Sequence, residues 1–303
     1  MFVFSDRALL AAVIAAKRRG VKVQIMLNPS RRSGKAENQH SRKMLKAAGV
    51  EVIDSNPTFG MTHEKSMVVD DKTAFVKSLN WETKNLTVTR DYAVVTSHKH
   101  EVREIIKCFE ADWKRKGFDA GTNAHLIWCT GNGRERIAQS IDDARHSIFV
   151  QNERYQDAVI IERLVRAARR GVKVHVMARP PHKLQKDKLT EAVGGLRIMD
   201  DVGIKVHKLK HLKLHAKMLL IDESRVIVGS INLAPGSFDS RRELAIEVSD
   251  DAVVERMVKI VKHDWKHSRP LDLTDEGLLA ELEQHNIEAA NELAIGVGRK
   301  KRK

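Results

Sequence analysis

Two histidine-lysine pairs are the residues of this chain whose types and spacing could do chemistry. The pattern H-x-K-x-x-x-x-D occurs twice, first as His63, Lys65 and Asp70 and then as His215, Lys217 and Asp222. The copies lie 152 positions apart, since 215 − 63 = 152. The same offset relates several flanking residues: Ser78 and Ser230, Asn80 and Asn232, Asp91 and Glu243, Asp112 and Asp264, and Trp113 and Trp265. Two copies with matching flanks indicate an internal repeat.

The duplicated residues suit attack on a phosphodiester. A site for this reaction must neutralise the phosphate oxygens and protonate the leaving group. We expect the paired lysines, asparagines and serines to bind phosphate: Lys65, Lys217, Ser78, Asn80, Ser230 and Asn232. Two histidines can provide a nucleophile and a general acid without a metal, because their ordinary pKa lies near neutral pH. Asp91 and Glu243 could each hold one imidazole in the tautomer it needs.

The spacing of the motif also separates its members. Side chains alternate across an extended strand, so His63 and Lys65 share one face while Asp70 points to the other. The same parity separates His215 and Lys217 from Asp222. We therefore expect both aspartates to be structural anchors in turns behind the site rather than catalytic acids. Neither half carries the whole set, so the site should lie on a pseudo-two-fold axis between the halves.

Helices and strands alternate in the segments that must position these residues. Polar caps, Ala/Leu/Arg-rich runs and glycine stops predict helices, and β-branched alternation predicts strands. The expected helices cover 8–19, 36–48, 134–145 and 157–170, and the expected strands cover 21–27, 50–53, 147–150, 172–177 and 203–206. This order indicates an α/β fold with a largely buried sheet in each half.

The chain of 303 residues suits two domains of about 150 residues each. We expect a first repeat at 1–117, a second at 124–268, and a C-terminal helix with a basic tail at 269–303. The first repeat lacks a counterpart of the 134–145 helix and of most of the 147–150 strand, so we expect the chain to start inside it. Cys108 and Cys129 have no disulfide or metal-site spacing and are expected to be reduced core residues.

The chain resembles the phospholipase D superfamily, whose hallmark is the paired H-x-K-x-x-x-x-D motif. The resemblance covers nearly all of residues 1–268, with one departure: Lys77 stands where the second copy has Gly229. It implies two α/β/α sandwich domains with the active site between them and a covalent phosphohistidine intermediate. By that resemblance His63 is the nucleophile and His215 the acid and then the base. The residues alone, being nearly symmetric, leave the order of the two histidines open.

A net charge of +14 predicts an anionic partner. Basic residues gather in loops after strands, where ligands of α/β sheets bind: Arg31, Arg32, Lys35, Arg179, His182, Lys183, Lys186, Lys188, Lys205, Lys208, Lys210 and Lys213. The chain looks most like bacterial phospholipase D and cardiolipin synthase-like members, so the expected substrate is a phospholipid at an anionic membrane surface. No apolar run reaches the length of a membrane span, which favours a cytoplasmic or peripheral protein.

Other interpretations remain open. A nuclease of the same superfamily would suit the charge equally well, although no aromatic residues interleave the basic loops as stacking platforms. A catalytically inactive binding protein on this fold is a third reading, against which both motifs are intact. His207, His211 and His215 have a helical metal-site spacing, but their segment has a strand pattern. We therefore expect no metal and no cofactor.

Overall fold

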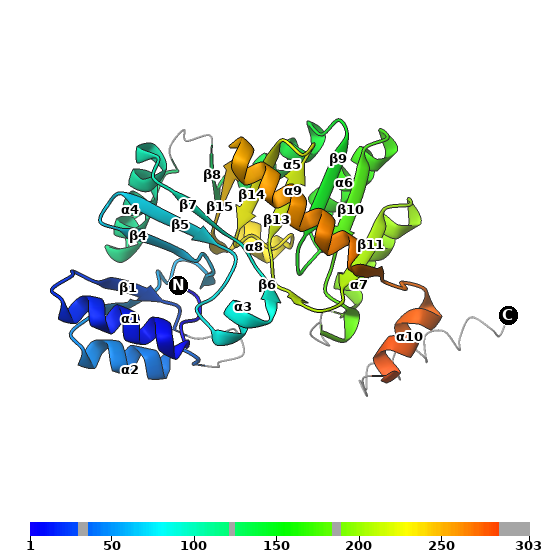
Figure 1. Ribbon diagram of the computed structural model, residues 1–303. Helices are drawn as coiled ribbons and strands as arrows, with labels where there is room; N and C mark the ends of the chain where they lie inside the picture. The colour runs from blue at the N-terminus through cyan, green and yellow to red at the C-terminus, as the bar shows by residue number, and fades with distance from the viewer. Residues whose placement is uncertain (30–35, 121–124, 184–188, 285–303) are drawn as a thin grey trace.

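A computed structural model describes residues 1–29, 36–120, 125–183 and 189–284 (Figure 1). Several predicted features lie outside these residues: the basic residues Arg31, Arg32, Lys35, Lys186 and Lys188, part of the expected inter-repeat segment, and the basic tail. None of the described helices is long and apolar enough to cross a membrane.

The first half consists of four helices and seven strands in the described residues up to 120. They are α1 (Arg7–Arg18), β1 (Gln24–Leu27), α2 (Gln39–Ala47), β2 (Glu51–Asp54), β3 (Met61–Thr62), β4 (Ser66–Val69), β5 (Thr73–Lys77), α3 (Thr83–Thr87), β6 (Thr89–Arg90), β7 (Ala93–Thr96) and α4 (Lys99–Trp113).

The second half follows the same plan and adds elements at both ends. It contains β8 (Leu126–Cys129), α5 (Gly133–Asp142), β9 (Ser147–Gln151), α6 (Ala158–Arg169), β10 (Lys173–Met177), the 3₁₀ helix η1 (Pro181–Lys183), α7 (Leu189–Asp201), β11 (Lys205–Leu209), β12 (Lys213–Leu214), β13 (Met218–Ile221), β14 (Arg225–Gly229), α8 (Pro235–Asp239), β15 (Arg241–Val248), α9 (Asp251–Lys266), β16 (Ser268–Pro270) and α10 (Asp275–Gln284).

Helices α1 and α6 show why the repeat folds in the same way twice. Asp6 and Asp157 cap them by accepting hydrogen bonds from the amides of Leu9 and Ile160. Both helices are followed by a glycine with positive φ, +92° at Gly20 and +90° at Gly171, a conformation that glycine adopts without strain. The expected helix-to-strand units are confirmed, although β1 begins at Gln24 and is shorter than predicted.

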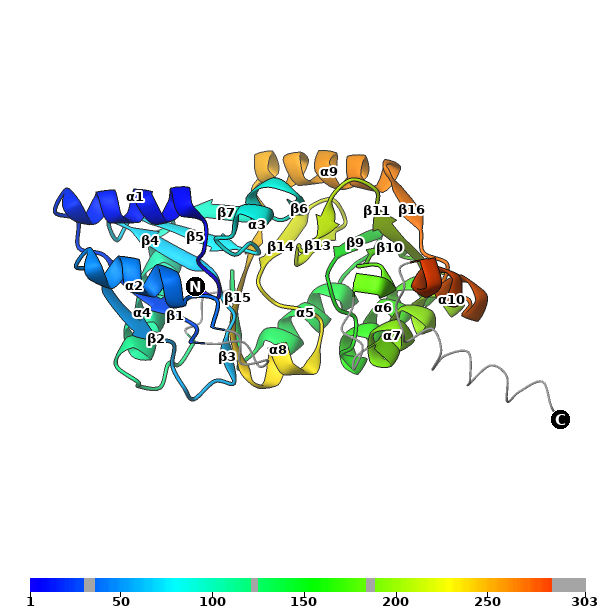
Figure 2. The ribbon, with the colours of Figure 1, turned by 90° about the horizontal axis from the view of Figure 1, so that it is seen from below.

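The second half is a complete α/β/α sandwich, whereas the first half has two small sheets. Strands β16-β11-β10-β9-β13-β14-β15 form one large sheet, with α9 over one face and α5 and α6 over the other (Figures 1 and 2). In the first half β1 pairs with β2, and β4-β5-β7 form a separate sheet. Strand β9 joins β10 to β13 in the second half, and no described strand joins β1 to β4 in this way. The α/β fold class with two repeats is confirmed.

The two halves exchange short strands. Strand β6 of the first half pairs with β12 of the second, with Thr89 opposite Lys213. Reciprocally, the start of β15 in the second half pairs with β3 in the first, with Arg241 opposite Met61. The segments just before Asp91 and Glu243 therefore lie beside the motif histidines of the opposite half.

An arginine-aspartate pair anchors each exchanged segment; the pair of Arg242 is buried and that of Arg90 is partly exposed. Arg242 donates two hydrogen bonds to Asp112 of α4, at 2.9 and 3.0 Å. Arg90, at the equivalent position of the repeat, donates two to Asp264 of α9, at 2.7 and 2.6 Å. The guanidinium and carboxylate match as a planar fork, which fixes their geometry. These pairs connect the halves crosswise, just as the exchanged strands do.

We predict that Arg242→Ala destabilises the protein by about 3–5 kcal/mol, because it leaves the buried Asp112 carboxylate without its main cation. Lys259→Ala is the matched control, since its pair with Glu255 is exposed on α9 and should contribute little to stability. Urea unfolding of both variants measures the difference. Equal small losses would show that the buried pair does not hold the halves together.

Lys77 and Gly229 occupy equivalent positions at the ends of β5 and β14, but only the second requires glycine. A Cβ atom on Gly229 would lie 2.3 Å from the Leu244 carbonyl oxygen. Lys77 is buried instead, with its ammonium 5.0 Å from the centre of the Trp81 ring, and burial lowers its pKa to about 8. The departure from the repeat is therefore accommodated inside the first half.

Candidate active site

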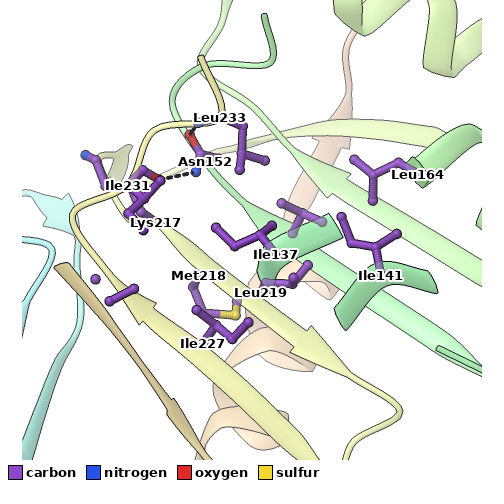
Figure 3. A pocket seen from close by; sticks show the side chains of 13 residues that line it. Ile137, Ile141, Asn152, Leu164, Lys217, Met218, Leu219, Ile227, Ile231 and Leu233 are labelled. Atoms are coloured by element: carbon purple, nitrogen blue, oxygen red, sulfur yellow. Dashed lines mark hydrogen bonds between the residues drawn. The ribbon is translucent and has the colours of Figure 1, made fainter. Parts of the chain in front are cut away.

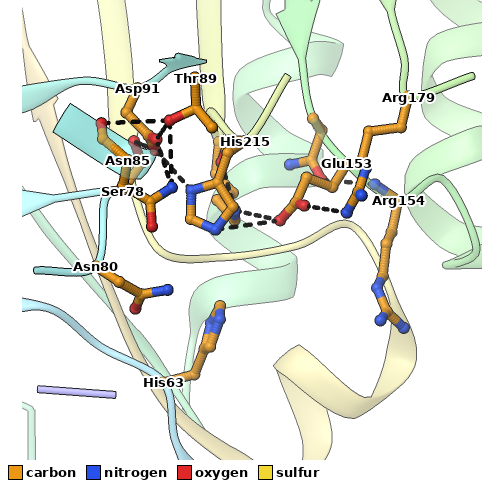
Figure 4. Close-up of polar contacts among 12 residues, drawn as sticks. His63, Ser78, Asn80, Asn85, Thr89, Asp91, Glu153, Arg154, Arg179 and His215 are labelled. Carbon is orange, nitrogen blue, oxygen red and sulfur yellow. Dashed lines mark hydrogen bonds and ion pairs between the residues drawn. The ribbon is translucent and has the colours of Figure 1, made fainter. Parts of the chain in front are cut away.

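His63 and His215 come from opposite halves, and their imidazole rings face a common space (Figure 4). His63 follows β3 and His215 follows β12, each before the next strand begins. The expected continuous strand through each motif is therefore wrong: residues 63–65 and 215–217 are extended links between two short strands. The irregular backbone still places histidine and lysine together, because Lys65 donates to the carbonyl of His63 and Lys217 to that of His215.

Each histidine is oriented by the acid of the other half. Glu243 accepts from Nδ1 of His63, with 2.9 and 3.0 Å between the nitrogen and the carboxylate oxygens. Asp91 accepts from Nδ1 of His215 at 2.8 Å. In both pairs Nδ1 is occupied, so Nε2 remains for chemistry. The exchange of β6 and β15 between the halves produces this crosswise pairing.

A hydrogen-bond network fixes the Asp91 carboxylate (Figure 4). The hydroxyls of Ser78 and Thr89 donate to it at 2.6 Å each, and the Asn85 amide donates at 3.2 Å. Asn85 and Thr89 lie outside the motif, and their contacts with Asp91 were not predicted from the sequence. Burial raises the pKa of Asp91, but the hydrogen bond and charge of His215 outweigh it and keep that pKa below its usual value.

Ser78 and Ser230 are fully buried, which differs from their expected contact with phosphate. The Ser78 hydroxyl donates to Asp91, and the Ser230 hydroxyl donates to the Leu244 carbonyl. Both hydroxyls also accept from a backbone amide, that of Tyr92 for Ser78 and that of Leu244 for Ser230. Because each hydroxyl already donates its proton inside the protein, neither serine has a donor left for a phosphate oxygen.

The lysines and asparagines of the two motif blocks are buried polar residues. Lys65, Lys217, Asn80 and Asn232 are each less than 5% exposed. The side-chain oxygens of both asparagines have no hydrogen-bond partner among the described residues. Burial lowers the pKa of Lys65 to about 7, although the charge of Glu243 opposes this. A bound phosphate would favour the charged ammonium, so the buried lysines suit an anionic ligand.

The protonation of His63 follows from its surroundings. Burial lowers its pKa well below the usual value, and the charges of Lys65 and Lys217 lower it further. Burial also raises the pKa of Glu243, against the charges of Lys65 and Arg241. A neutral imidazole that donates from Nδ1 keeps a lone pair on Nε2, as a nucleophile requires.

Asp70 and Asp222 lie in turns, with φ of +53° and +51°. Asp222 accepts from three successive amides, those of Arg145, His146 and Ser147, at 2.7 to 2.9 Å. These bonds attach the β13–β14 turn to the start of β9. The motif aspartates thus take no part in the cluster around the two histidines.

Two charged residues that the motif did not identify as catalytic complete the second half of the site. Glu153 accepts from Lys217 at 2.5 Å and from Arg179 at 2.7 Å, and it lies 3.7 Å from Nε2 of His215. Burial opposes ionisation of Glu153, but the charges of Lys217, His215 and Arg179 hold its pKa well below the usual range. Its position in the loop that follows β9 was the available sequence signal.

Other basic and histidine residues take different positions. Lys208 and His182 both contact Glu281 of α10, and Lys210 is exposed. His207 hydrogen-bonds Ser268 and stacks on Trp265, whereas His215 faces Asp91, so the two do not share a site. Cys108 and Cys129 are buried free thiols, and burial raises the pKa of both.

A cavity of about 20 Å³ lies on the core side of Lys217 (Figure 3). Its walls are mostly apolar and include Ile137, Leu164 and Ile231. This volume suits about one water molecule and is far below that of a small-molecule pocket. The cavity is therefore too small to be a small-molecule site, and neither His63 nor His215 lines it.

The family model described as "Cardiolipin synthase, PLD-like domain" matches residues 1–113 and 137–265. Cardiolipin synthase B of Shigella flexneri is 25% identical over 290 aligned positions, covering 80% of this chain and 67% of the relative. The minor cardiolipin synthase ClsB of Bacillus subtilis is 24% identical, covering 84% of this chain and 71% of the relative.

Two solved structures share the fold. Phosphatidylserine synthase of Haemophilus influenzae superposes with a TM-score of 0.71 at 11% identity, covering 99% of this chain and 87% of its own. Polyphosphate kinase of Porphyromonas gingivalis has a TM-score of 0.67 at 16% identity, covering 89% of this chain and 43% of its own. At these identities the likeness concerns the arrangement of the helices and strands alone.

Proposed function

Because this chain belongs to the family of cardiolipin synthase, phospholipase D-like domains, we propose that it is a metal-independent phosphodiesterase that acts on phospholipids. The reaction is hydrolysis of the headgroup ester, transfer of the phosphatidyl group to an alcohol, or both. The crosswise pairing of His63 with Glu243 and of His215 with Asp91 carries this proposal. The two oriented imidazoles face one space, and each is followed two residues later by a buried lysine.

The proposed reaction has two steps. Nε2 of His63 attacks phosphorus, the bond from phosphorus to the headgroup oxygen breaks, and His215 gives that oxygen a proton. The intermediate is a phosphohistidine. His215, now neutral, then takes a proton from water or an alcohol, whose oxygen attacks phosphorus and releases His63. Lys65 and Lys217 neutralise the phosphate oxygens in both steps.

A lipid substrate is supported by the names of the relatives, which are cardiolipin synthases. The formal charge of +14 suits an anionic membrane surface. The serine hydroxyls, expected to bind phosphate, donate to Asp91 in the case of Ser78 and to the Leu244 carbonyl in the case of Ser230. The proposed phosphate ligands are therefore Lys65, Lys217, Asn80 and Asn232.

We predict that a primary alcohol diverts the product to a phosphatidylalcohol, because a phosphohistidine can be captured by either acceptor. The purified protein is incubated in EDTA with phosphatidylglycerol vesicles and increasing 1-butanol, and lipid products are separated by mass. Phosphatidylbutanol should form at the expense of phosphatidic acid, and its yield should not change with EDTA.

Parallel reactions with phosphatidylcholine and single-stranded DNA distinguish the alternatives. Cleavage of DNA without lipid turnover would support a nuclease, and no cleavage of any substrate would support an inactive binding protein. Turnover that EDTA abolishes and Zn²⁺ or Mg²⁺ restores would contradict the metal-independent mechanism.

A further inference from the structure

Glu153 and Phe2 occupy equivalent positions in the two halves of the repeat. Phe4 and Tyr155 make equivalent isolated bridges, to Trp81 and Leu233 respectively, and lie 151 positions apart, since 155 − 4 = 151. The cap residues Asp6 and Asp157 have the same offset. Counting back two positions from Tyr155 and from Phe4 gives Glu153 and Phe2. The two halves therefore differ at one equivalent position beside the catalytic pair.

In the second half this position carries a carboxylate. Glu153 reaches from the end of β9 to Lys217, and its Oε2 lies 3.7 Å from Nε2 of His215 (Figure 4). That distance is too long for a good hydrogen bond, yet short enough for strong electrostatic attraction in a buried site. With Asp91 at Nδ1, the His215 ring stands between two carboxylates.

In the first half the equivalent position carries an aromatic ring. Phe2 meets His63 edge to face, with 5.0 Å between the ring centres, and the Lys65 ammonium lies 5.2 Å from the centre of the Phe2 ring. His63 thus has one orienting carboxylate, Glu243, and an apolar neighbour where His215 has a second carboxylate. Burial against that neighbour disfavours a positive charge on His63.

We propose that Glu153 is the positioning residue that assigns the acid role to His215, by stabilising the proton on its Nε2. Phe2, at the same place in the first half, leaves His63 neutral as the nucleophile. The inference rests on the proposed function for its catalytic consequence, but the effect on the proton of His215 is independent of any substrate. It explains how a nearly symmetric pair of motifs can perform two different tasks.

Several charged groups face His215 and together determine how easily it holds a proton. Asp91 approaches from the segment after β6, Glu153 from the end of β9, and Lys217 from the motif itself. His63 faces it from the other half. Loss of the Glu153 charge therefore removes one of the two carboxylates that flank the ring, whereas the charge of Lys217 remains beside it.

Glu153→Gln tests the proposal because it retains the shape of the side chain and removes its charge. Glu281→Gln is a matched control, since Glu281 also accepts from a lysine, Lys208, and from a histidine, His182, with similar burial but on α10. NMR titration of ¹³C-labelled histidine, with His215→Gln to assign the signal, should show the His215 midpoint about one pH unit lower in Glu153→Gln. Glu281→Gln should leave that midpoint unchanged.

The kinetic consequence follows from the same shift. Above the midpoint, a shift of one pH unit leaves about tenfold less protonated His215. Glu153→Gln should therefore turn over an alkyl phosphodiester about tenfold more slowly at alkaline pH, with the alkaline limb of kcat/KM at lower pH. A p-nitrophenyl phosphodiester, whose leaving group needs no proton, should lose much less. Glu153→Asp, which keeps the carboxylate, should recover most of the alkaline activity.

The two readouts separate the inference from the proposed function. A lowered His215 midpoint in a protein that cleaves no phosphodiester would retain the inference and reject the proposed function. An unchanged midpoint in Glu153→Gln, or an equal shift in Glu281→Gln, would overturn the inference. Equal rate losses on both leaving groups would also overturn it, since they would indicate a merely structural role.

Discussion

Replacement of His63 by alanine is expected to abolish covalent labelling and turnover. His63 is the buried imidazole whose pKa is lowered by burial and whose Nδ1 is held by Glu243, so its Nε2 is the proposed nucleophile. His215→Ala should behave differently, because it removes the acid and leaves the nucleophile in place. Loss of general acid catalysis costs about 10²- to 10⁴-fold, and a p-nitrophenyl leaving group should recover part of this loss.

His215→Ala should also trap phosphate on His63, because the base that activates water in the second step is missing. Mass spectrometry of the quenched protein would locate the adduct on the peptide that contains His63. His98→Ala, which removes an exposed histidine of the first half, is the control and should react normally. An adduct on the His215 peptide, found in His63→Ala, would reverse the two roles while retaining the paired-histidine mechanism.

The second large effect is expected when the orienting acids are replaced. Each replacement should impair the histidine of the opposite half. Glu243→Gln should slow phosphorylation of His63 by about 10³- to 10⁴-fold, because an amide cannot hold the imidazole in the same tautomer and charge state. Asp91→Asn should instead impair His215 and slow the second step. Burst kinetics with a p-nitrophenyl phosphodiester distinguish them: Asp91→Asn should retain the burst, and Glu243→Gln should lose it.

Asp70→Asn is the matched control for the acids. Asp70 belongs to the same motif but lies exposed in the β4–β5 turn, so both phases should remain near their wild-type rates. If Asp91→Asn lost the burst and Glu243→Gln retained it, each acid would serve the histidine of its own half, contrary to the distances in the structure.

Local signals were sufficient for much of this protein. Caps such as Asp6, stops such as Gly20 and alternating β-branched residues predicted helices and strands to within a few residues, because these features act over one or two turns of chain. The alternation of these helices and strands indicated the α/β class, and the 152-residue offset identified the repeat and the paired histidines and lysines. The least accurate expectation concerned the motif backbone. A continuous strand was expected there, but residues 63–65 form an extended link between two short strands.

Which acid serves which histidine was decided only by the tertiary structure. His63 and Glu243 are 180 positions apart, and the sequence is equally compatible with pairing within a half or across it. The exchange of β6 and β15, anchored by Arg90 and Arg242, selects the crosswise arrangement. Both arginines occur at the repeat offset, but their spacing in the sequence does not show which half each side chain packs against.

The asymmetry at Phe2 and Glu153 has the same origin. Neither residue belongs to the motif, and each lies more than 60 positions before the histidine that it contacts. The sequence alone determined which chemical groups are repeated, because these residues occur at short, fixed spacings within each half. Only the folded chain determined how the two copies share it, because pairing, burial and charge depend on which distant segments pack together.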